Sequence, residues 1–148
     1  MNFAFNRTVN APLDRVFSIY ADFENAANRI DGIERVELLT DAPIGVGTKF
    51  RETRMMFGRE STEEMEVTVF EPNQKYTVEA LSCGAHFLTE FRFQPEGNGT
   101  KVEFEMRTRA VSIFAKLMSP LGIFFAGSMK KCFMADIDQL KDYCEQAV

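Results

Sequence analysis

Tryptophan is absent from the chain, histidine occurs once, and the three cysteines, Cys83, Cys132 and Cys144, lie far apart. Zinc sites and disulfide frameworks need cysteines or histidines at short, characteristic spacings, so the sequence predicts neither a metal site nor disulfides. Scattered cysteines in odd number are typical of a reducing compartment, and we expect a cytoplasmic protein. Phosphate-binding loops and Ser-His-Asp arrangements are also missing, and we expect no cofactor.

Clustered positive charge and long apolar runs are scarce as well. The net charge is −5, and no basic run exceeds Lys130-Lys131. Nucleic-acid recognition needs a concentrated basic surface, so we expect no nucleic-acid partner. The most apolar segment, 111–129, is interrupted by Lys116 and by the SPLG stretch that begins at Ser119. It is a poor membrane span, and the N-terminus does not resemble a signal peptide, so we expect no stable membrane insertion.

Large apolar side chains are plentiful, with 15 Phe and 8 Met in 148 residues. A chain of this length suits one domain, residues 1–148, with enough interior for a real core. Methionine adapts to irregular spaces, and phenylalanine adds apolar area without a polar group. Such a set can fill a core or line an apolar cavity, and composition leaves both open.

The hydrophobic pattern predicts an α+β chain with about seven antiparallel strands. Segment 3–10 alternates like a strand, and a helix whose first turn suits Pro12 follows it. A second short helix is expected at about 24–30. The remaining strands are expected near 33–40, 46–56, 59–70, 75–81, 84–94 and 100–110. Residues 111–146 read as helical, with a break at Ser119-Pro120, so that the long helix begins near residue 120.

Alternation of charge and apolarity predicts the strand pairing. Pairing Lys49 with Glu66 across a turn at 57–58 joins opposite charges outside and places Phe50 opposite Met65 inside. The same reasoning predicts inner-face pairs in the later hairpins: Val69–Tyr76, Val67–Val78, Val78–Phe87, Ala80–Ala85, Phe93–Phe104 and Phe91–Met106. The result is a meander with an apolar inner face and a charged outer face. The long C-terminal helix is available to cover the inner face.

Charged residues interrupt the inner face near the tip of the central hairpin. The predicted register places Glu52 opposite Glu63, with Arg54 diagonal to Glu63. Facing carboxylates can raise one another's pKa where water is scarce, which would suit acid/base catalysis. Alternatively, Arg54 binds a ligand carboxylate, or the group forms a solvated tip. We expect polar rim groups, with Arg54 orienting a ligand, and assign no catalytic residue.

Three further polar residues are candidates for the interior. His86 is the usual kind of proton shuttle near neutral pH, but alternation places it on the outer face opposite Glu79. Arg7 shares a strand face with aromatic residues, and it either pairs with an acid or ligand inside or ends in solvent. Asp136 lies on the apolar side of the last helix, at the edge of the stripe or inside a cavity.

The order of strand, two short helices, six-stranded meander and long C-terminal helix resembles the START-like helix-grip superfamily. The resemblance is to its polyketide cyclase/dehydrase and lipid-transport branch. Four stretches carry it: NAPLDRVFSIYADFEN (10–25), GVGTKFR (45–51), VFEPNQKYTVEA (69–80) and DIDQLKDYCEQ (136–146). The stretch NRIDGIERVE (28–37) departs from the branch, which often has Trp-Xaa-Pro-Gly before its second strand.

The resemblance implies a curved sheet wrapped around the C-terminal helix, with an apolar cavity between them. Its walls would be Phe50, Met65, Val67, Val78, Phe87, Phe91, Met106, Phe114, Met118, Leu121, Phe125, Met129 and Phe133, with Arg54, Glu52 and Glu63 as the polar groups.

The superfamily includes carriers, receptors, cyclases and hydrolases, so fold alone does not fix function. We expect binding or transport of a hydrophobic small molecule, such as a lipid, aromatic or polyketide-like compound. The alternative is a cyclase, dehydratase or hydrolase acting on such a compound. A protein partner at the outer sheet is less favoured, because that face is charged.

Overall fold

The computed structural model describes residues 2–41, 43–56, 58–82 and 84–146, with side chains throughout except at Met56 and 114–126. In chain order the elements are β1 Asn2–Val9, α1 Leu13–Tyr20, the 3-10 helix η1 Phe23–Asn28, β2 Ile33–Leu38, β3 Lys49–Met56, β4 Arg59–Glu71, β5 Lys75–Ser82, β6 Ala85–Glu96, β7 Gly99–Ala110 and α2 Ile113–Gln146.

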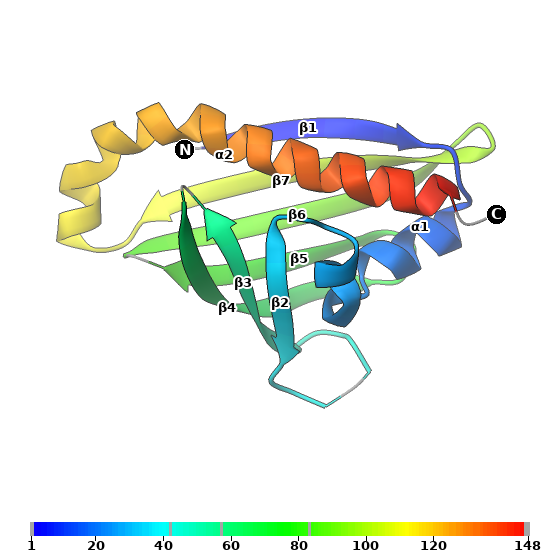
Figure 1. The fold of residues 1–148 in the computed structure, drawn as a ribbon, viewed down its shortest axis with the longest axis horizontal. Coiled ribbons are helices and arrows are strands. Elements are labelled where there is room, and N and C mark those ends of the chain that lie inside the picture. Colours follow the sequence, from blue (N-terminus) through cyan, green and yellow to red (C-terminus); the bar gives the residue numbers. More distant parts are fainter. Residues whose placement is uncertain (1, 42, 57, 83, 147–148) are drawn as a thin grey trace.

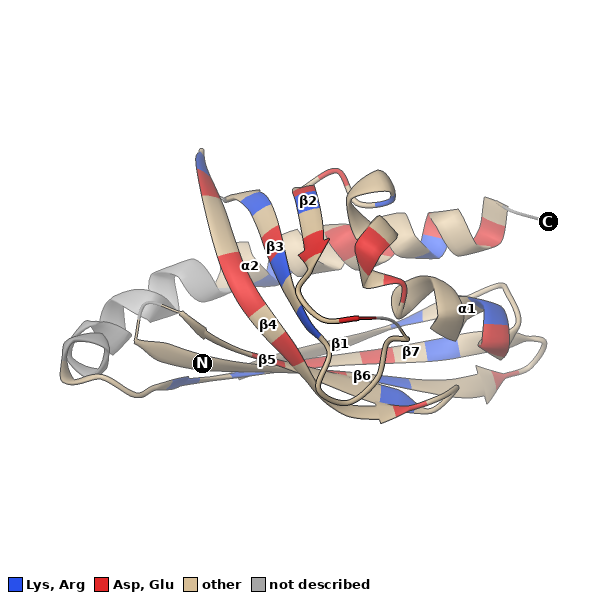
Figure 2. Ribbon diagram, turned by 90° about the horizontal axis from the view of Figure 1, so that it is seen from below, with Lys and Arg blue, Asp and Glu red and all other residues tan. Residues whose placement is uncertain are grey.

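All seven strands belong to one antiparallel sheet, in the order β1-β7-β6-β5-β4-β3-β2. The sheet curves, and α2 lies along its concave side, while α1 and η1 sit at one end (Figure 1). The strands carry charges of both signs, with several acidic bands along β4 (Figure 2). The predicted helix-grip architecture, with two short helices after the first strand, is confirmed.

Aromatic packing closes the end of the sheet beneath α1 and η1. The apolar face of α1 is buried, and its Phe17 meets Phe93 edge-on with ring centroids 5.1 Å apart. In η1, Phe23 stacks on Phe50 of β3 at 4.8 Å. Such pairs add to the free energy gained by apolar burial, so the short helices are held rigidly against the sheet.

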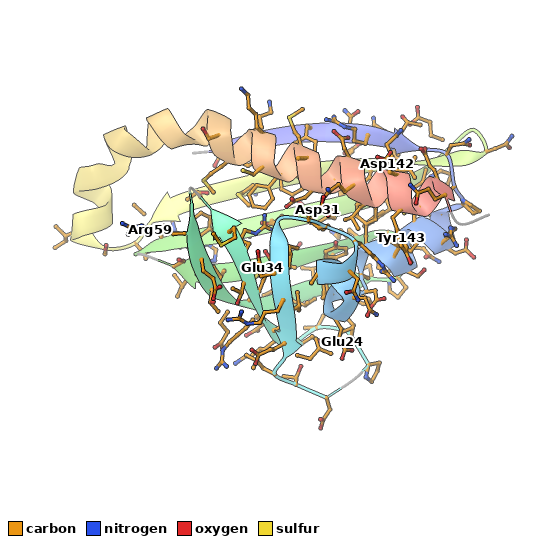
Figure 3. All side chains as sticks on the ribbon, in the orientation of Figure 1. Glu24, Asp31, Glu34, Arg59, Asp142 and Tyr143 are labelled. Carbon is orange, nitrogen blue, oxygen red and sulfur yellow. The ribbon has the colours of Figure 1, made fainter. Side chains whose placement is uncertain are left out.

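The C-terminal half of α2 docks through its buried residues Ile137, Leu140 and Cys144. It is also tied to the loop between η1 and β2, where Asp31 lies beside α2 (Figure 3). Asp31 and Gln139 of α2 exchange two hydrogen bonds of 2.9 and 2.8 Å. The last helix begins at Ile113 rather than near residue 120, and α2 is continuous to Gln146. The predicted break at Ser119-Pro120 was therefore wrong, because a proline in a first turn and a proline inside a longer helix leave the same sequence pattern.

The predicted register of the central hairpin is confirmed. Lys49 pairs with Glu66, and Phe50 with Met65. The β4–β5 pairing is correct at Val67–Val78, but a bulge follows, so that Phe70 rather than Val69 pairs with Tyr76. The predicted Val69–Tyr76 pair was therefore wrong. A bulge adds one residue to one strand, and here it turns Phe70 inward, 5.5 Å from Phe17.

The next two hairpins are each shifted by two residues from the predicted register. Ala80 pairs with Phe87 rather than Ala85, and Phe91 pairs with Phe104 rather than Met106. The predicted pairs Val78–Phe87 and Phe93–Phe104 were wrong for the same reason: Val78 pairs with Thr89 and Phe93 with Val102.

Glycines at positive φ explain where these two hairpins turn. Gly84 has φ 74° and Gly97 has φ 60°, a conformation that glycine adopts readily. A shift of two leaves every side chain on its predicted face, because the side-chain period of a strand is two. The inner and outer faces of these two hairpins therefore remain as predicted.

Candidate ligand-binding site

A cavity of about 210 Å³ lies between the concave face of the sheet and α2. Most of its wall is apolar. Several side chains predicted as wall residues line it: Phe50, Met65, Val78, Phe87, Phe91, Met106, Met129 and Phe133.

The other predicted wall residues lie elsewhere or outside the described side chains. Val67 is fully buried in the core and does not line the cavity. Its position beside the β4 bulge accounts for this, because the strand changes direction there. Phe114, Met118, Leu121 and Phe125 lie in 114–126, outside the described side chains.

One section of the wall was missed by sequence reasoning. The short helices and the loop after them contribute Ile19, Tyr20, Phe23, Ala26 and Ile30. The apolar stripe of α1 indicated that this helix packs inward. That stripe carried no information about which end of the sheet it covers.

Arg54 of β3 is the centre of the polar part of the wall. Its Nη2 lies 2.7 Å from Glu52 Oε1, and its Nη1 lies 2.8 Å from Asp136 Oδ2 of α2. The exposed fractions of the three side chains are only 11, 13 and 10%, for Arg54, Glu52 and Asp136 respectively. The group is thus nearly buried rather than at an exposed rim, because α2 passes over this part of β3.

Glu63 faces Glu52 across the β3–β4 pair, as the register predicted. It takes no part in the Arg54 ion pairs and instead accepts a hydrogen bond from Ser61 Oγ at 3.2 Å. Sequence reasoning offered Glu63 as the acid that Arg54 could neutralise and missed both actual partners: Glu52, two positions earlier on the same strand, and Asp136, 82 positions away. The predicted register pairs strand residues with one another and does not place a residue of a helix against the sheet.

Burial and charge shape the protonation of this group. Burial raises the pKa of Asp136, and the nearby guanidinium of Arg54 opposes that rise without cancelling it. For Arg54, burial acts to lower the pKa, but Glu52 and Asp136 outweigh it and hold the pKa above its usual value. Arg54 is therefore a permanent cation, and its guanidinium also lies 5.3 Å from the ring centroid of Phe133.

Of the residues left open by the sequence, only Asp136 reaches the cavity. Arg7 points to α2, where its Nε lies 2.6 Å from Asp138 Oδ1. His86 is on the outer face with its Nε2 2.8 Å from Glu79 Oε1. The partner was predicted correctly, although the two residues are diagonal, since His86 is paired directly with Leu81.

Two tyrosines, Tyr20 of α1 and Tyr76 of β5, meet where the first helix packs on the sheet. The Tyr76 hydroxyl donates a hydrogen bond to the backbone carbonyl of Tyr20 at 3.1 Å. The Tyr20 hydroxyl is buried and has no hydrogen-bond partner among the described residues. Burial raises the pKa of both phenols, so both remain neutral and neither supplies a phenolate.

Within the described residues, no group of three or more His, Cys, Asp or Glu side chains is arranged to hold a metal ion. Across the same part of the chain, no helix has the length and apolarity needed to cross a membrane.

Comparison with known proteins places this geometry in context. A family model described as polyketide cyclase/dehydrase and lipid transport matches residues 2–145. No curated protein matches the chain.

Solved structures share the fold. A START superfamily protein from Mycobacterium smegmatis is 16% identical with a TM-score of 0.79, covering 99% of each chain. The ZhuI aromatase/cyclase from Streptomyces sp. R1128 is 18% identical with a TM-score of 0.75, covering 99% of this chain and 94% of that one. The di-domain aromatase/cyclase StfQ of the steffimycin biosynthetic pathway is 15% identical with a TM-score of 0.81. The match covers 98% of this chain, which spans only 50% of StfQ.

Proposed function

Because this chain belongs to the polyketide cyclase/dehydrase and lipid-transport family, we propose that it binds or transports a hydrophobic small molecule in the cavity between the sheet and α2. The ligand is a lipid, aromatic or polyketide-like compound. The observation that carries the proposal is the cavity itself, which is mostly apolar with a few polar groups on one wall. Small-molecule sites are typically built in this way.

The size and the lining of the cavity favour a compact ligand. A volume of about 210 Å³ is below the range of roughly 300–1,000 Å³ that is usual for drug-sized ligands. Met65, Met106 and Met129 line the wall, and methionine side chains repack readily around different shapes. A flat aromatic molecule or a short alkyl chain fits this description best.

A cyclase or dehydratase is the second candidate, and one observation favours it. Glu52 and Asp136 converge on Arg54 inside the cavity, and convergent titratable groups are what acid/base catalysis requires. Both carboxylates, however, are engaged as counter-ions of Arg54. The only histidine lies on the outer face of the sheet. Binding without turnover is therefore the function that we favour.

The test combines detection of a bound molecule with a blocked cavity. Native mass spectrometry of the purified protein should reveal a co-purified apolar molecule, and Nile red should bind with saturable fluorescence. Ala80 lines the cavity, whereas the next residue, Leu81, is an exposed position on the outer face. Ala80→Phe should weaken dye binding by at least about tenfold, and the matched control Leu81→Phe should leave it unchanged.

Two results would count against the proposal. Equal dye binding by Ala80→Phe and Leu81→Phe would place the dye outside the cavity. Turnover of a polyketide-like substrate that Glu52→Gln abolishes without weakening its affinity would make the enzyme the better description.

A further inference from the structure

Negative charge is in excess on the polar wall of the cavity. Glu52, Glu63 and Asp136 line it together with a single cation, Arg54. A further lining carboxylate, Asp22, is already paired outside the cavity wall with Arg29, 3.0 Å away. The three remaining carboxylates therefore face one guanidinium, so the wall is not positive in any ionisation state that keeps Glu52 charged.

The charge of Arg54 is already compensated on two sides. Glu52 approaches its Nε and Nη2, and Asp136 approaches its Nη1, all within 2.8 Å. A ligand carboxylate brought to Arg54 would meet both of these anions at close range, where all three side chains are nearly buried. Like charges are strongly unfavourable there because solvent screens them little.

Hydrogen-bond acceptors, in contrast, remain available. Arg54 engages Glu52 through Oε1 and Asp136 through Oδ2. Among the described residues, no donor reaches Glu52 Oε2 or Asp136 Oδ1. A carboxylate oxygen accepts hydrogen bonds and cannot donate them when ionised. A ligand that donates an O–H or N–H would satisfy these oxygens.

From these observations we infer that the cavity selects apolar molecules whose polar head is a hydroxyl or an amine, and that it discriminates against carboxylates. Free fatty acids and aromatic acids are thus disfavoured, although an isolated Arg54 would have favoured them. The inference rests on the proposed function, because it names the class of ligand for the same cavity.

The experiment uses three probes that share a naphthalene ring: 2-naphthalenemethanol, 2-naphthalenemethylamine and 2-naphthoate. The protein lacks tryptophan, so the fluorescence polarisation of the naphthalene can be read with little background. Binding is measured to the full chain at pH 7. The alcohol and the amine should bind at least about tenfold more tightly than the acid.

Two variants test the cause of this preference. Removing one negative charge by Glu52→Gln should tighten naphthoate and weaken the amine, each by about tenfold. Glu60→Gln is the control, since Glu60 pairs with Arg35 where both side chains are exposed, and it should change neither affinity. Circular dichroism confirms folding, and the ranking in the unaltered protein stands without any variant.

Failure of the inference is separable from failure of the proposed function. Equal affinities, or tightest binding of naphthoate, would overturn the inference alone while the binding function stood. Binding of Nile red without binding of any of the three probes would likewise overturn the inference and leave the binding function standing. If neither the probes nor the dye binds, both fail. An unchanged ranking in Glu52→Gln would also overturn the inference, because charge would then not be the cause.

Discussion

Arg54 shows how a single buried cation organises the interior. It joins β3 to α2 through Asp136 and is held in place on its own strand by Glu52. Removal of one member of a buried ion pair leaves an uncompensated charge, which is far more damaging than the loss of an exposed pair. The polar wall is therefore part of the fold as well as of the site.

We predict that Arg54→Ala lowers the free energy of unfolding by about 3–5 kcal/mol, because Glu52 and Asp136 are left buried without a counter-ion. Urea unfolding followed by circular dichroism measures this. Arg35→Ala, on the neighbouring strand, breaks the exposed pair with Glu60 and should cost no more than about 1 kcal/mol. Similar losses in the two variants would mean that the Arg54 group is solvated.

The ionisation of Asp136 should make the unfolding free energy depend on pH. Its pKa is raised in the folded protein, so the folded state binds more protons than the unfolded state above pH about 4. The stability contribution of Asp136 is then full at low pH and declines as pH rises towards the folded-state pKa. The difference in unfolding free energy between the original protein and Asp136→Asn should show this decline.

Glu79 is a useful comparison, because its pKa is shifted in the opposite direction from that of Asp136. The nearby Thr68 hydroxyl and then His86, whose Nε2 lies 2.8 Å from Glu79 Oε1, lower its pKa. Its contribution is therefore present above its unfolded pKa and lost as pH falls. A Glu79→Gln difference curve that ran parallel to that of Asp136→Asn would contradict the assigned directions.

At the scale of elements, the faces of the sheet could be predicted from sequence, but not every partner along them. Lys49–Glu66 was placed correctly because opposite charges distinguish that register from its neighbours. Ala80–Ala85 was wrong by two residues, since such a shift preserves every face. The bulge that brings Phe70 inward leaves no mark in the alternation, because it is fixed by packing against Phe17.

The candidate site was predictable to the same degree. Wall residues such as Phe50 and Phe87 followed from alternation within the strands. The Arg54–Asp136 contact could not be predicted in this way, because it depends on the position of α2 along the sheet. The helix's own apolar stripe leaves that position undetermined.

Ile137 is one of the buried side chains through which the described part of α2 docks. It is almost fully buried, so Ile137→Ala should lower the free energy of unfolding by about 2–5 kcal/mol. Lys131 is exposed on the same helix, and Lys131→Ala should stay within about 0.5 kcal/mol. Thermal or urea unfolding of the two variants measures both losses of unfolding free energy. A small loss at Ile137 would mean that α2 packs loosely.

Two cysteines differ in burial on the same helix. Cys132 is exposed, whereas Cys144 is buried, and burial raises the pKa of the Cys144 thiol to about 11. The thiolate is the reactive form, so iodoacetamide at pH 8 should label Cys132 at least about tenfold faster. Peptide mass spectrometry follows each site. Equal rates would show that the end of α2 opens readily.

For the whole molecule, the cavity couples binding to stability. A ligand that binds only the folded state adds about 2.7 kcal/mol at roughly 100 times its Kd. Saturating 2-naphthalenemethanol should therefore raise the melting temperature of the unaltered protein. Ala80→Phe should melt at the same temperature with and without the compound. A rise in Ala80→Phe equal to that of the original protein would place binding elsewhere.

The pairing of the first strand with the last has a further consequence, for synthesis in the cell. Asn2 of β1 pairs with Arg107 of β7, and Val9 pairs with Thr100. At about 5–20 residues per second, β1 waits roughly 5–20 s for this partner. During that interval Phe3 and Phe5 have no β7 to pack against. The yield of folded protein should therefore depend on translation rate and chaperone supply, even where the stability of the finished fold is unchanged.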